Sequence, residues 1–197
     1  MLILASASPR RRSLLAQAGV RCEVIPAEMD ETPRAGETPI AYVERLALEK
    51  ARVIHALHPE ATVLGADTTV AMSATSGGSG GEQTILSKPV DLAEAERMLL
   101  ALSNRVHEVH TGVALVLPGL AAAQRTHVET TRVFFGPIPA EELAFYLSTG
   151  DSLDKAGAYG IQGYAARWIT RIEGDFFNVM GLPVAATVSL LRETRNL

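Results

Sequence analysis

The stretch MLILASASPRRRSLLAQAG, residues 1–19, contains the strand, turn and helix that decide the fold class. Its apolar residues 2–5 are typical of a buried strand, and Ser8 followed by Pro9 is a common start of a helix, with Ser8 as its cap. Gly19 stands just past the apolar side chains of that helix, where helices commonly end. A short buried strand followed at once by a helix is the repeating unit of α/β domains.

The rest of the chain continues this alternation of short apolar runs and longer stretches with helical spacing. Further helices are expected at 39–57 (capped by Thr38), 92–102 (capped by Asp91), 139–148 and 183–193. Further strands are expected at 63–72, 84–86, 106–117, 123–134 and 168–172. The sequence therefore predicts an α/β fold. It shows no internal repeat, and we expect residues 1–197 to form a single domain.

Composition and charge exclude several classes of function. A chain of 197 residues can bury roughly 70% of its unfolded surface, so it needs no disulfide or structural metal for stability. Its 18 basic and 22 acidic residues argue against a protein that coats nucleic acid, although a local cationic pocket stays open. Cys22 is the single cysteine, which indicates a reducing compartment.

Targeting and membrane segments are also not expected. No run approaches the roughly 18 apolar residues that a membrane span requires. The basic residues 10–12 follow the apolar start, whereas a secretory signal has its charges first. We therefore expect a cytoplasmic protein without a membrane partner or a nucleic-acid polymer as partner.

The turn after the first strand favours the binding of an anion. Backbone amides at a helix start carry partial positive charge, and the hydroxyls of Ser6 and Ser8 are donors. Arg10 and Arg11 can add forked bonds to phosphate oxygens. The alternative is a capped helix whose arginines are merely solvated. Three consecutive arginines oppose the helix dipole unless an anion offsets them, so an anion site is the favoured interpretation.

Lysines and acids mark further candidate positions. Only Lys50, Lys88 and Lys155 are lysines among the 18 basic residues, and a compact ammonium suits a phosphate pocket, although chance explains so small a number equally well. Asp67 follows a buried run, where a carboxylate can hold a divalent ion or accept a proton, or else close a turn. Asp30-Glu31-Thr32-Pro33 is either part of a metal shell or a solvated turn.

Other chemistries find no support in the sequence. It contains no Gly-x-Ser-x-Gly elbow, no Walker A motif and no Gly-x-Gly-x-x-Gly that opens a helix. The glycine-rich stretch 73–83 is interpreted as the tip of a hairpin rather than a phosphate loop, because no helix follows it. His107 and His110 lie on opposite faces of a strand and are expected to be ordinary strand residues. A cleft suited to metal-assisted phosphoanhydride chemistry is the remaining interpretation.

Eight short motifs occur in one order along the chain: SASPRR (6–11), DETP (30–33), LEKA (48–51), GADT (65–68), LSKP (86–89), HTG (110–112), DKAGAYGIQG (154–163) and VMGLP (179–183). Each is weak alone, and the complete set is specific. On these motifs the chain resembles the Maf nucleoside triphosphate pyrophosphatases over nearly its whole length.

The resemblance implies a two-lobed mixed-sheet α/β fold with a deep cleft, similar to the inosine triphosphate pyrophosphatase-like (Maf/Ham) fold. It implies hydrolysis of a nucleoside triphosphate between the α and β phosphates with a divalent cation, Mg²⁺ or Mn²⁺. Asp67 would be the proton acceptor and a metal ligand. The other carried-over positions are Ser6, Arg11, Lys50 and Lys88 for the triphosphate, and Glu31 and Glu49 near metal or water.

Three further positions look like the branch of the family that acts on dTTP and UTP. These are Arg10, Thr68 and Gln162, of which Gln162 can match the O4/N3–H edge of a pyrimidine. Two alternatives stay open: a 7-methyl-GTP-type pyrophosphatase of the same fold, and a nucleotide-sensing regulator of septum formation without turnover. A homodimer is compatible with the sequence, which does not establish it.

Overall fold

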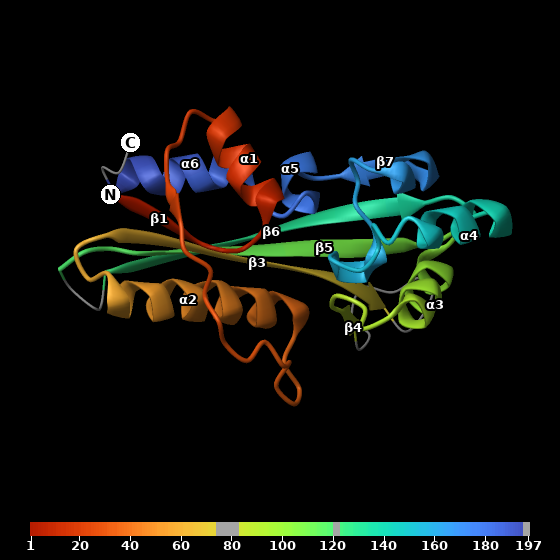
Figure 1. Cartoon of the computed structure of the whole chain (residues 1–197), viewed down its shortest axis with the longest axis horizontal. Coiled ribbons are helices and arrows are strands. Elements are labelled where there is room, and N and C mark those ends of the chain that lie inside the picture. The colour runs from red at the N-terminus through yellow and green to blue at the C-terminus, as the bar shows by residue number, and fades with distance from the viewer. Residues whose placement is uncertain (74–82, 120–122, 195–197) are drawn as a thin grey trace. The chain divides into compact units, whose positions relative to one another are not determined.

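The computed structural model describes residues 1–73, 83–119 and 123–194, with helices and strands interspersed along the chain (Figure 1). The strands are β1 (Leu2–Ala5), β2 (Glu23–Val24), β3 (Thr62–Ser73), β4 (Gln83–Leu86), β5 (Val106–Val116), β6 (Gln124–Phe135) and β7 (Ile169–Glu173). The helices are α1 (Pro9–Gln17), α2 (Pro39–Leu57), α3 (Leu92–Leu102), α4 (Ala140–Ser148), α5 (Phe176–Val179) and α6 (Val184–Glu193).

The described strands form one mixed sheet. Hydrogen-bonded neighbours follow the order β2–β1–β3–β5–β6–β7, and β4 pairs with β3. The pairs of β1 with β2 and β3 are parallel, whereas the pairs β3–β4 and β6–β7 are antiparallel. The predicted α/β class is thereby confirmed. No helix within the described ranges is long and apolar enough to cross a membrane.

The chain divides into two compact units, which share the strands β3, β5 and β6 between them along the sequence. Unit 1 consists of Met1–Thr68, Thr111–Glu129 and Gly181–Leu197, and unit 2 consists of Thr69–His110 and Thr130–Met180. The sequence shows no boundary because the chain passes from one unit to the other inside continuous strands. That two lobes share one cleft stays a prediction.

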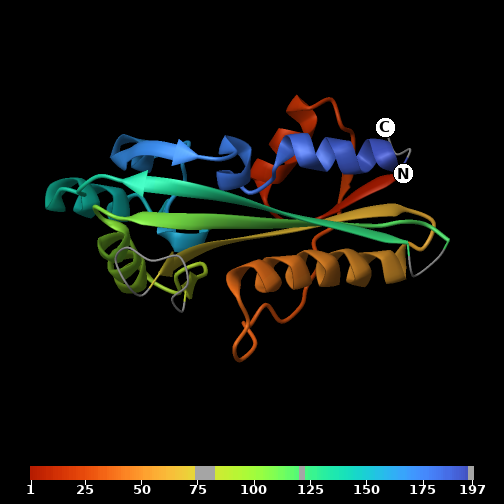
Figure 2. The same cartoon turned by 180° about the vertical axis from the view of Figure 1, so that it is seen from behind.

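In unit 1 the strands β1, β2 and the first part of β3 run parallel. Ile3 of β1 pairs with Glu23 on one side and Val63 on the other, and the register continues to Ala5 and Gly65. Helices α1 and α6 cover one face of these strands and α2 covers the other, as both views show (Figure 1, Figure 2). Buried apolar side chains fill the α2 side: Ile3, Ala5, Ala51, Ile54, Ala61, Val63 and Val116.

Two glycines let α2 lie directly on the strands beneath it. A Cβ added at Gly65 of β3 would stand 2.0 Å from the carbonyl oxygen of Ala47, and one added at Gly112 of β5 would stand 2.3 Å from that of Val43. Real Cβ atoms do not approach backbone so closely, so glycine is required at both positions. The close approach of α2 to β3 brings Lys50, which follows Ala47 on α2, beside Asp67, which follows Gly65 on β3.

Unit 2 is built around an aromatic core. Phe135, Tyr146, Tyr159 and Trp168 pack with the apolar faces of α3 and α4. Short 3-10 turns at Ala156–Ala158 and Tyr164–Trp168 carry the glycine-spaced motif along this core. The backbone of Gly157 has φ +66°, and a Cβ there would meet the side chain of Val70 at 2.8 Å. Glycine at this position is therefore set by both conformation and space.

Most predicted elements are confirmed, and the differences have local reasons. Thr38 and Asp91 accept hydrogen bonds from the amides of Ala41 and Glu94, as expected of helix caps. Ser8 occupies the cap position of α1, but its side chain makes no cap bond, so this part of the expectation is wrong. The strand β2 and helix α5 were not expected, because two and four residues are too short to show a period.

The structure also bears on the predictions for the glycine-rich stretch and for the two strand histidines. Ser73 pairs with Gln83 across β3 and β4, which confirms the hairpin, while its tip at 74–82 lies outside the described residues.

His107 and His110 are buried on β5, and His107 Nε2 lies 2.7 Å from the hydroxyl of Tyr159. Burial lowers the pKa of His107 to about 3, so this ring is a neutral core residue.

Candidate active site

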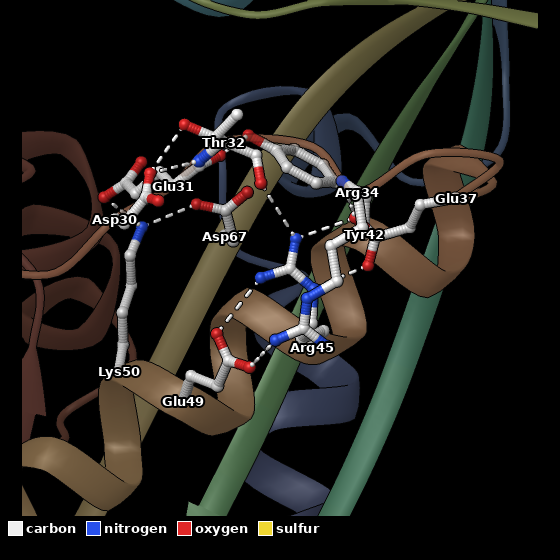
Figure 3. A network of polar contacts seen from close by, with 10 residues as sticks. All are labelled: Asp30, Glu31, Thr32, Arg34, Glu37, Tyr42, Arg45, Glu49, Lys50 and Asp67. Carbon is white, nitrogen blue, oxygen red and sulfur yellow. Dashed lines mark hydrogen bonds and ion pairs between the residues drawn. The ribbon is translucent and has the colours of Figure 1, made fainter.

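A buried carboxylate and a buried ammonium meet in unit 1. Asp67 lies on β3 two residues after Gly65, and Lys50 lies on α2 one turn after Ala47. Lys50 Nζ is 2.6 Å from Asp67 Oδ1 and 2.8 Å from Glu31 Oε1, so one ammonium joins two carboxylates (Figure 3). The Asp67 side chain is 9% exposed, whereas that of Glu31 is 46% exposed.

Burial sets the acid–base properties of Asp67. Loss of solvent raises the pKa of its carboxyl group, and this is the largest effect. The positive charges of Lys50 and Arg11 lower the same pKa, and the negative charge of Glu31 raises it slightly. Among the described residues no donor contacts Oδ2, while Oδ1 accepts the bond from Lys50. A buried carboxylate with raised proton affinity and one open oxygen is suited to take a proton from water.

Arg11 of α1 lies inside unit 1 rather than on its surface. Its Nε donates to Gly181 O at 2.7 Å, and its Nη1 donates at 2.9 Å to both Ser6 Oγ and Ala66 O. Its Nη2 donates to Thr68 Oγ1, also at 2.9 Å. Burial lowers the pKa of this guanidinium, and the charge of Asp67 raises it in part.

The three arginines of the first helix therefore have different roles. Arg11 is buried and lies in the field of Asp67, Arg10 is half-buried, and Arg12 is exposed. The sequence predicted an anion that offsets the arginine charges at the start of the helix. For Arg11 the Asp67 carboxylate of the protein supplies that negative charge. Ser6 accepts bonds from Arg11 and from the Ser8 amide, so its own hydroxyl hydrogen stays available for donation.

Glu49 does not join Asp67. Its two carboxylate oxygens contact Arg34 at 2.9 Å and Arg45 at 3.1 Å, along the outer side of α2 (Figure 3). No group of three or more histidine, cysteine, aspartate or glutamate side chains in the described part of the chain could hold a metal ion. The expected set of Glu31, Glu49 and Asp67 is therefore not a preformed metal shell, because arginines occupy Glu49.

A smaller set of oxygens does fit a divalent ion. Glu31 Oε1 and Asp67 Oδ1 both contact Lys50 Nζ, at 2.8 and 2.6 Å, so the ammonium fills the point on which they converge, and an ion would be held beside it by the same two carboxylates. Mg²⁺ is commonly held by one or two carboxylates with phosphate oxygens and water completing the shell. The residues present thus fit an ion whose remaining ligands come from a bound phosphate and from water.

The loop that carries Glu31 is fixed to α2 by contacts that the sequence reading missed. Arg45 contacts both oxygens of Glu37, at 2.6 and 2.7 Å, and donates to the carbonyl of Thr32. Tyr42 donates its hydroxyl to the carbonyl of Glu31. The four-residue spacing of Arg45 and Glu49 on a helix is the sequence feature that could have indicated part of this network.

The two acids of the motif at 30–33 separate into the two roles that the sequence left open. Asp30 Oδ1 accepts bonds from the amide and hydroxyl of Thr32, which closes a turn and lowers the pKa of Asp30. Glu31 instead extends to Lys50. The motif therefore supplies one turn residue and one site residue.

Lys88 and Gln162 belong to unit 2, where both side chains are exposed. Lys88 follows β4, and the neighbouring carbonyl of Ser87 accepts a bond from the Gly157 amide at 3.2 Å. The turn with Lys88 is thereby tied to the glycine-spaced motif that contains Gln162. Lys155 donates to Asp151 and Asp154 at 2.6 to 2.7 Å, so it holds this motif together rather than facing a ligand.

The chain is similar to known proteins in sequence and in fold. Residues 1–194 match the family model described as Maf-like protein. A dTTP/UTP pyrophosphatase of Myxococcus xanthus is 49% identical over 97% of this chain and 91% of its own length. Another dTTP/UTP pyrophosphatase, from Koribacter versatilis, is 48% identical over 97% of this chain and 93% of its own length. A HAM1 protein structure from Coxiella burnetii shares the fold, with TM-score 0.52, 18% identity and 98% of each chain covered.

Proposed function

The chain belongs to the Maf family, and from this premise we propose that it is a pyrophosphatase that hydrolyses dTTP and UTP to the nucleoside monophosphate and pyrophosphate. The names of the two relatives above support the substrates. The observation that carries the chemistry is the buried Asp67, bound through one oxygen to Lys50 and open at the other.

In the proposed reaction Asp67 accepts a proton from the attacking water through Oδ2. Lys50 holds Oδ1 at 2.6 Å and fixes the direction of the carboxylate, and it also keeps Glu31 close. Ser6 donates its hydroxyl to a phosphate oxygen beside the amides that open α1. Pyrophosphate then leaves as a stabilised anion.

A divalent cation is part of this proposal. Asp67 and Glu31 would hold Mg²⁺ or Mn²⁺, and the ion would neutralise phosphate charge. The two carboxylates lie close together, since both contact Lys50, and this proximity supports them as protein ligands of the cation. Glu49 is left out, because Arg34 and Arg45 hold both its oxygens.

The choice of base is proposed to depend on Arg10, Thr68 and Gln162, with Lys88 as a further phosphate contact. Gln162 offers one donor and one acceptor to the pyrimidine edge. Thr68 follows Asp67 on β3, and its hydroxyl is bonded to Arg11 and Thr111. Replacing Arg10→Trp is expected to lower kcat/KM for dTTP by about tenfold relative to a purine triphosphate, and equal ratios in the two proteins would remove Arg10 from specificity.

We also propose the cytoplasm as the compartment and a homodimer as an assembly to be tested. The free thiol of Cys22 supports a reducing compartment. Size-exclusion chromatography with light scattering would give the mass in solution and decide the second point.

A screen for products tests the proposed function. The protein is incubated with equal concentrations of dTTP, UTP, CTP, dATP, dGTP and 7-methyl-GTP, with Mg²⁺, with Mn²⁺ or with chelator. Pyrophosphate and monophosphate are then quantified. We expect both products in equal amounts from dTTP and UTP, and none with chelator. Preference for 7-methyl-GTP would favour the other branch of the family, and binding without pyrophosphate release would favour a sensor.

A further inference from the structure

The Arg11 guanidinium has almost no hydrogen-bonding capacity left for a ligand. A guanidinium has five N–H groups, and four of those in Arg11 donate to protein oxygens at 2.7 to 2.9 Å. A phosphate is held by two parallel N–H groups, either Nε with one terminal nitrogen or the two terminal nitrogens together. On the edge formed by Nε and a terminal nitrogen, Nε–H already donates to Gly181 O. On the edge formed by the two terminal nitrogens, both hydrogens of Nη1 already donate, to Ser6 Oγ and Ala66 O. No edge with two free N–H groups remains.

The acceptors of these bonds lie on both sides of Asp67. Nη1 holds the carbonyl of Ala66, the residue before Asp67, and Nη2 holds the hydroxyl of Thr68, the residue after it. The hydroxyl of Thr68 also lies 2.9 Å from that of Thr111, which is fully buried on β5. Arg11 therefore fixes the short backbone segment from which the Asp67 side chain extends.

The other two bonds of Arg11 reach one segment that is distant in sequence and one that is near. Nε reaches Gly181 O, 170 residues further along, and Nη1 reaches Ser6 Oγ. Gly181 has φ +108°, a conformation that other residues rarely adopt. The planar fork thus joins three chain segments at fixed angles, and a lysine ammonium in the same place could not reach all four acceptors.

We propose that Arg11 is a positioning residue that fixes Asp67 through Ala66 and Thr68, and that it does not anchor the triphosphate. This inference rests on the proposed function, because it concerns Asp67 as the proton acceptor. Lys50 fixes one oxygen of the Asp67 carboxylate, and Arg11 holds the carbonyl of Ala66 before it and the hydroxyl of Thr68 after it. A misplacement of about 1 Å in a reacting group can cost about 100-fold in rate.

The two possible roles separate when binding and turnover are measured apart. Binding is measured by calorimetry with α,β-methylene-dTTP, in which a CH₂ group replaces the bridging oxygen of the scissile bond. Turnover is measured as pyrophosphate released from dTTP. The variants are Arg11→Lys, which keeps the charge but loses the fork, and Thr111→Val, whose buried side chain cannot touch substrate. Arg12→Met is the matched control, because Arg12 is an exposed arginine next along the same helix.

The expected result is a loss of kcat without a loss of affinity. In Arg11→Lys we expect kcat to fall by about 100-fold while Kd for the analogue changes by less than about threefold. Thr111→Val is expected to lower kcat in the same way, and the double variant is expected to lose less than the product of the two single losses. Thermal unfolding identifies the temperatures at which each variant is fully folded, and all rates are compared there.

Three results would overturn the inference. One is a Kd that rises about tenfold or more in Arg11→Lys with kcat unchanged, as for a phosphate anchor. Another is independence of the Arg11 and Thr111 effects, with losses that multiply. The third is a wild-type protein that binds the analogue but releases no pyrophosphate, which would refute the proposed function as well; the first two refute only the role of Arg11.

Discussion

Replacing Lys50→Met tests how the buried charges of the site depend on one another. The methionine keeps the length and much of the volume of the side chain but removes the ammonium that bonds Asp67 at 2.6 Å and Glu31 at 2.8 Å. Glu31 is 46% exposed, so losing its ion pair costs at most about 1 kcal/mol. Asp67 is 9% exposed, and breaking a buried pair typically costs about 3–5 kcal/mol. Protonation of Asp67 limits this cost, so we expect a loss of about 3 kcal/mol in the free energy of unfolding near pH 8.

The sign of the pH dependence follows from the pKa of Asp67. Without Lys50 this pKa, already raised by burial, rises further, because Lys50 lowers it in the wild type. Between the unfolded value of 3.8 and the higher folded value, the folded state then binds more protons than the unfolded state. Stability of the variant therefore falls as the pH rises through this window, and the difference from wild type is smallest near pH 4.

Urea unfolding followed by circular dichroism at several pH values measures this effect. The double variant Lys50→Met/Asp67→Asn is the matched control, since it also removes the carboxylate that Lys50→Met leaves without its ion pair, while Arg11 keeps its hydrogen bonds to protein oxygens. We expect it to be more stable near pH 8 than Lys50→Met alone. The reasoning would be refuted by a loss below about 1 kcal/mol that does not vary with pH, or by a double variant no more stable than the single one.

Further predictions concern the loop of Glu31 and the motif of Gln162. Contact with Arg45 lowers the pKa of Glu37 to about 2 from the usual 4.5, so the stability from this pair is present above pH 4.5 and is lost as the pH falls toward 2. Unfolding of Glu37→Gln and wild type should therefore differ less near pH 2 than near pH 6, and a constant difference would contradict the pairing. In unit 2, Gly157→Ala should lower the free energy of unfolding by about 1–2 kcal/mol more than Gly150→Ala. Both glycines have φ near +70°, but only the Cβ of the first would meet Val70, so equal losses in calorimetry would exclude the contact as the cause.

Elements with local sequence features were predictable. The caps Thr38 and Asp91 act within three residues of their own position, and the apolar spacing that follows each cap is long enough to define a helix. The strand β2 gains its structure from pairing with β1 rather than from its own two residues. Such an element has no period of its own, so the sequence could not reveal it.

The pair of Asp67 and Lys50 was only partly predictable. Position after a buried strand made Asp67 a candidate, with a turn aspartate as the alternative, and the family resemblance named both residues. Their contact depends on Gly65, which lets α2 approach the strand to within backbone contact of Ala47. A tertiary contact of this kind follows from packing and cannot be obtained from the spacing of the two residues.

Arg11 shows a different limit. The sequence indicated that arginines at a helix start need an anion, and an external phosphate was the natural candidate. The structure turns Arg11 inward onto Ala66 O and Gly181 O, with the charge of Asp67 nearby. Backbone carbonyls are the same for every residue type, so no sequence pattern identifies them as partners. The neighbouring Arg12, with the same side chain, remains exposed.

The most direct test of the site as a whole is the turnover of dTTP by Asp67→Asn, measured beside its affinity for α,β-methylene-dTTP. Asparagine keeps the shape of the side chain but cannot take a proton from water at neutral pH. We expect kcat to fall by about 100- to 10,000-fold, with the protein folded and the analogue still bound. A folded Asp67→Asn protein that releases pyrophosphate at the wild-type rate would contradict the account, since the proton would then have another acceptor.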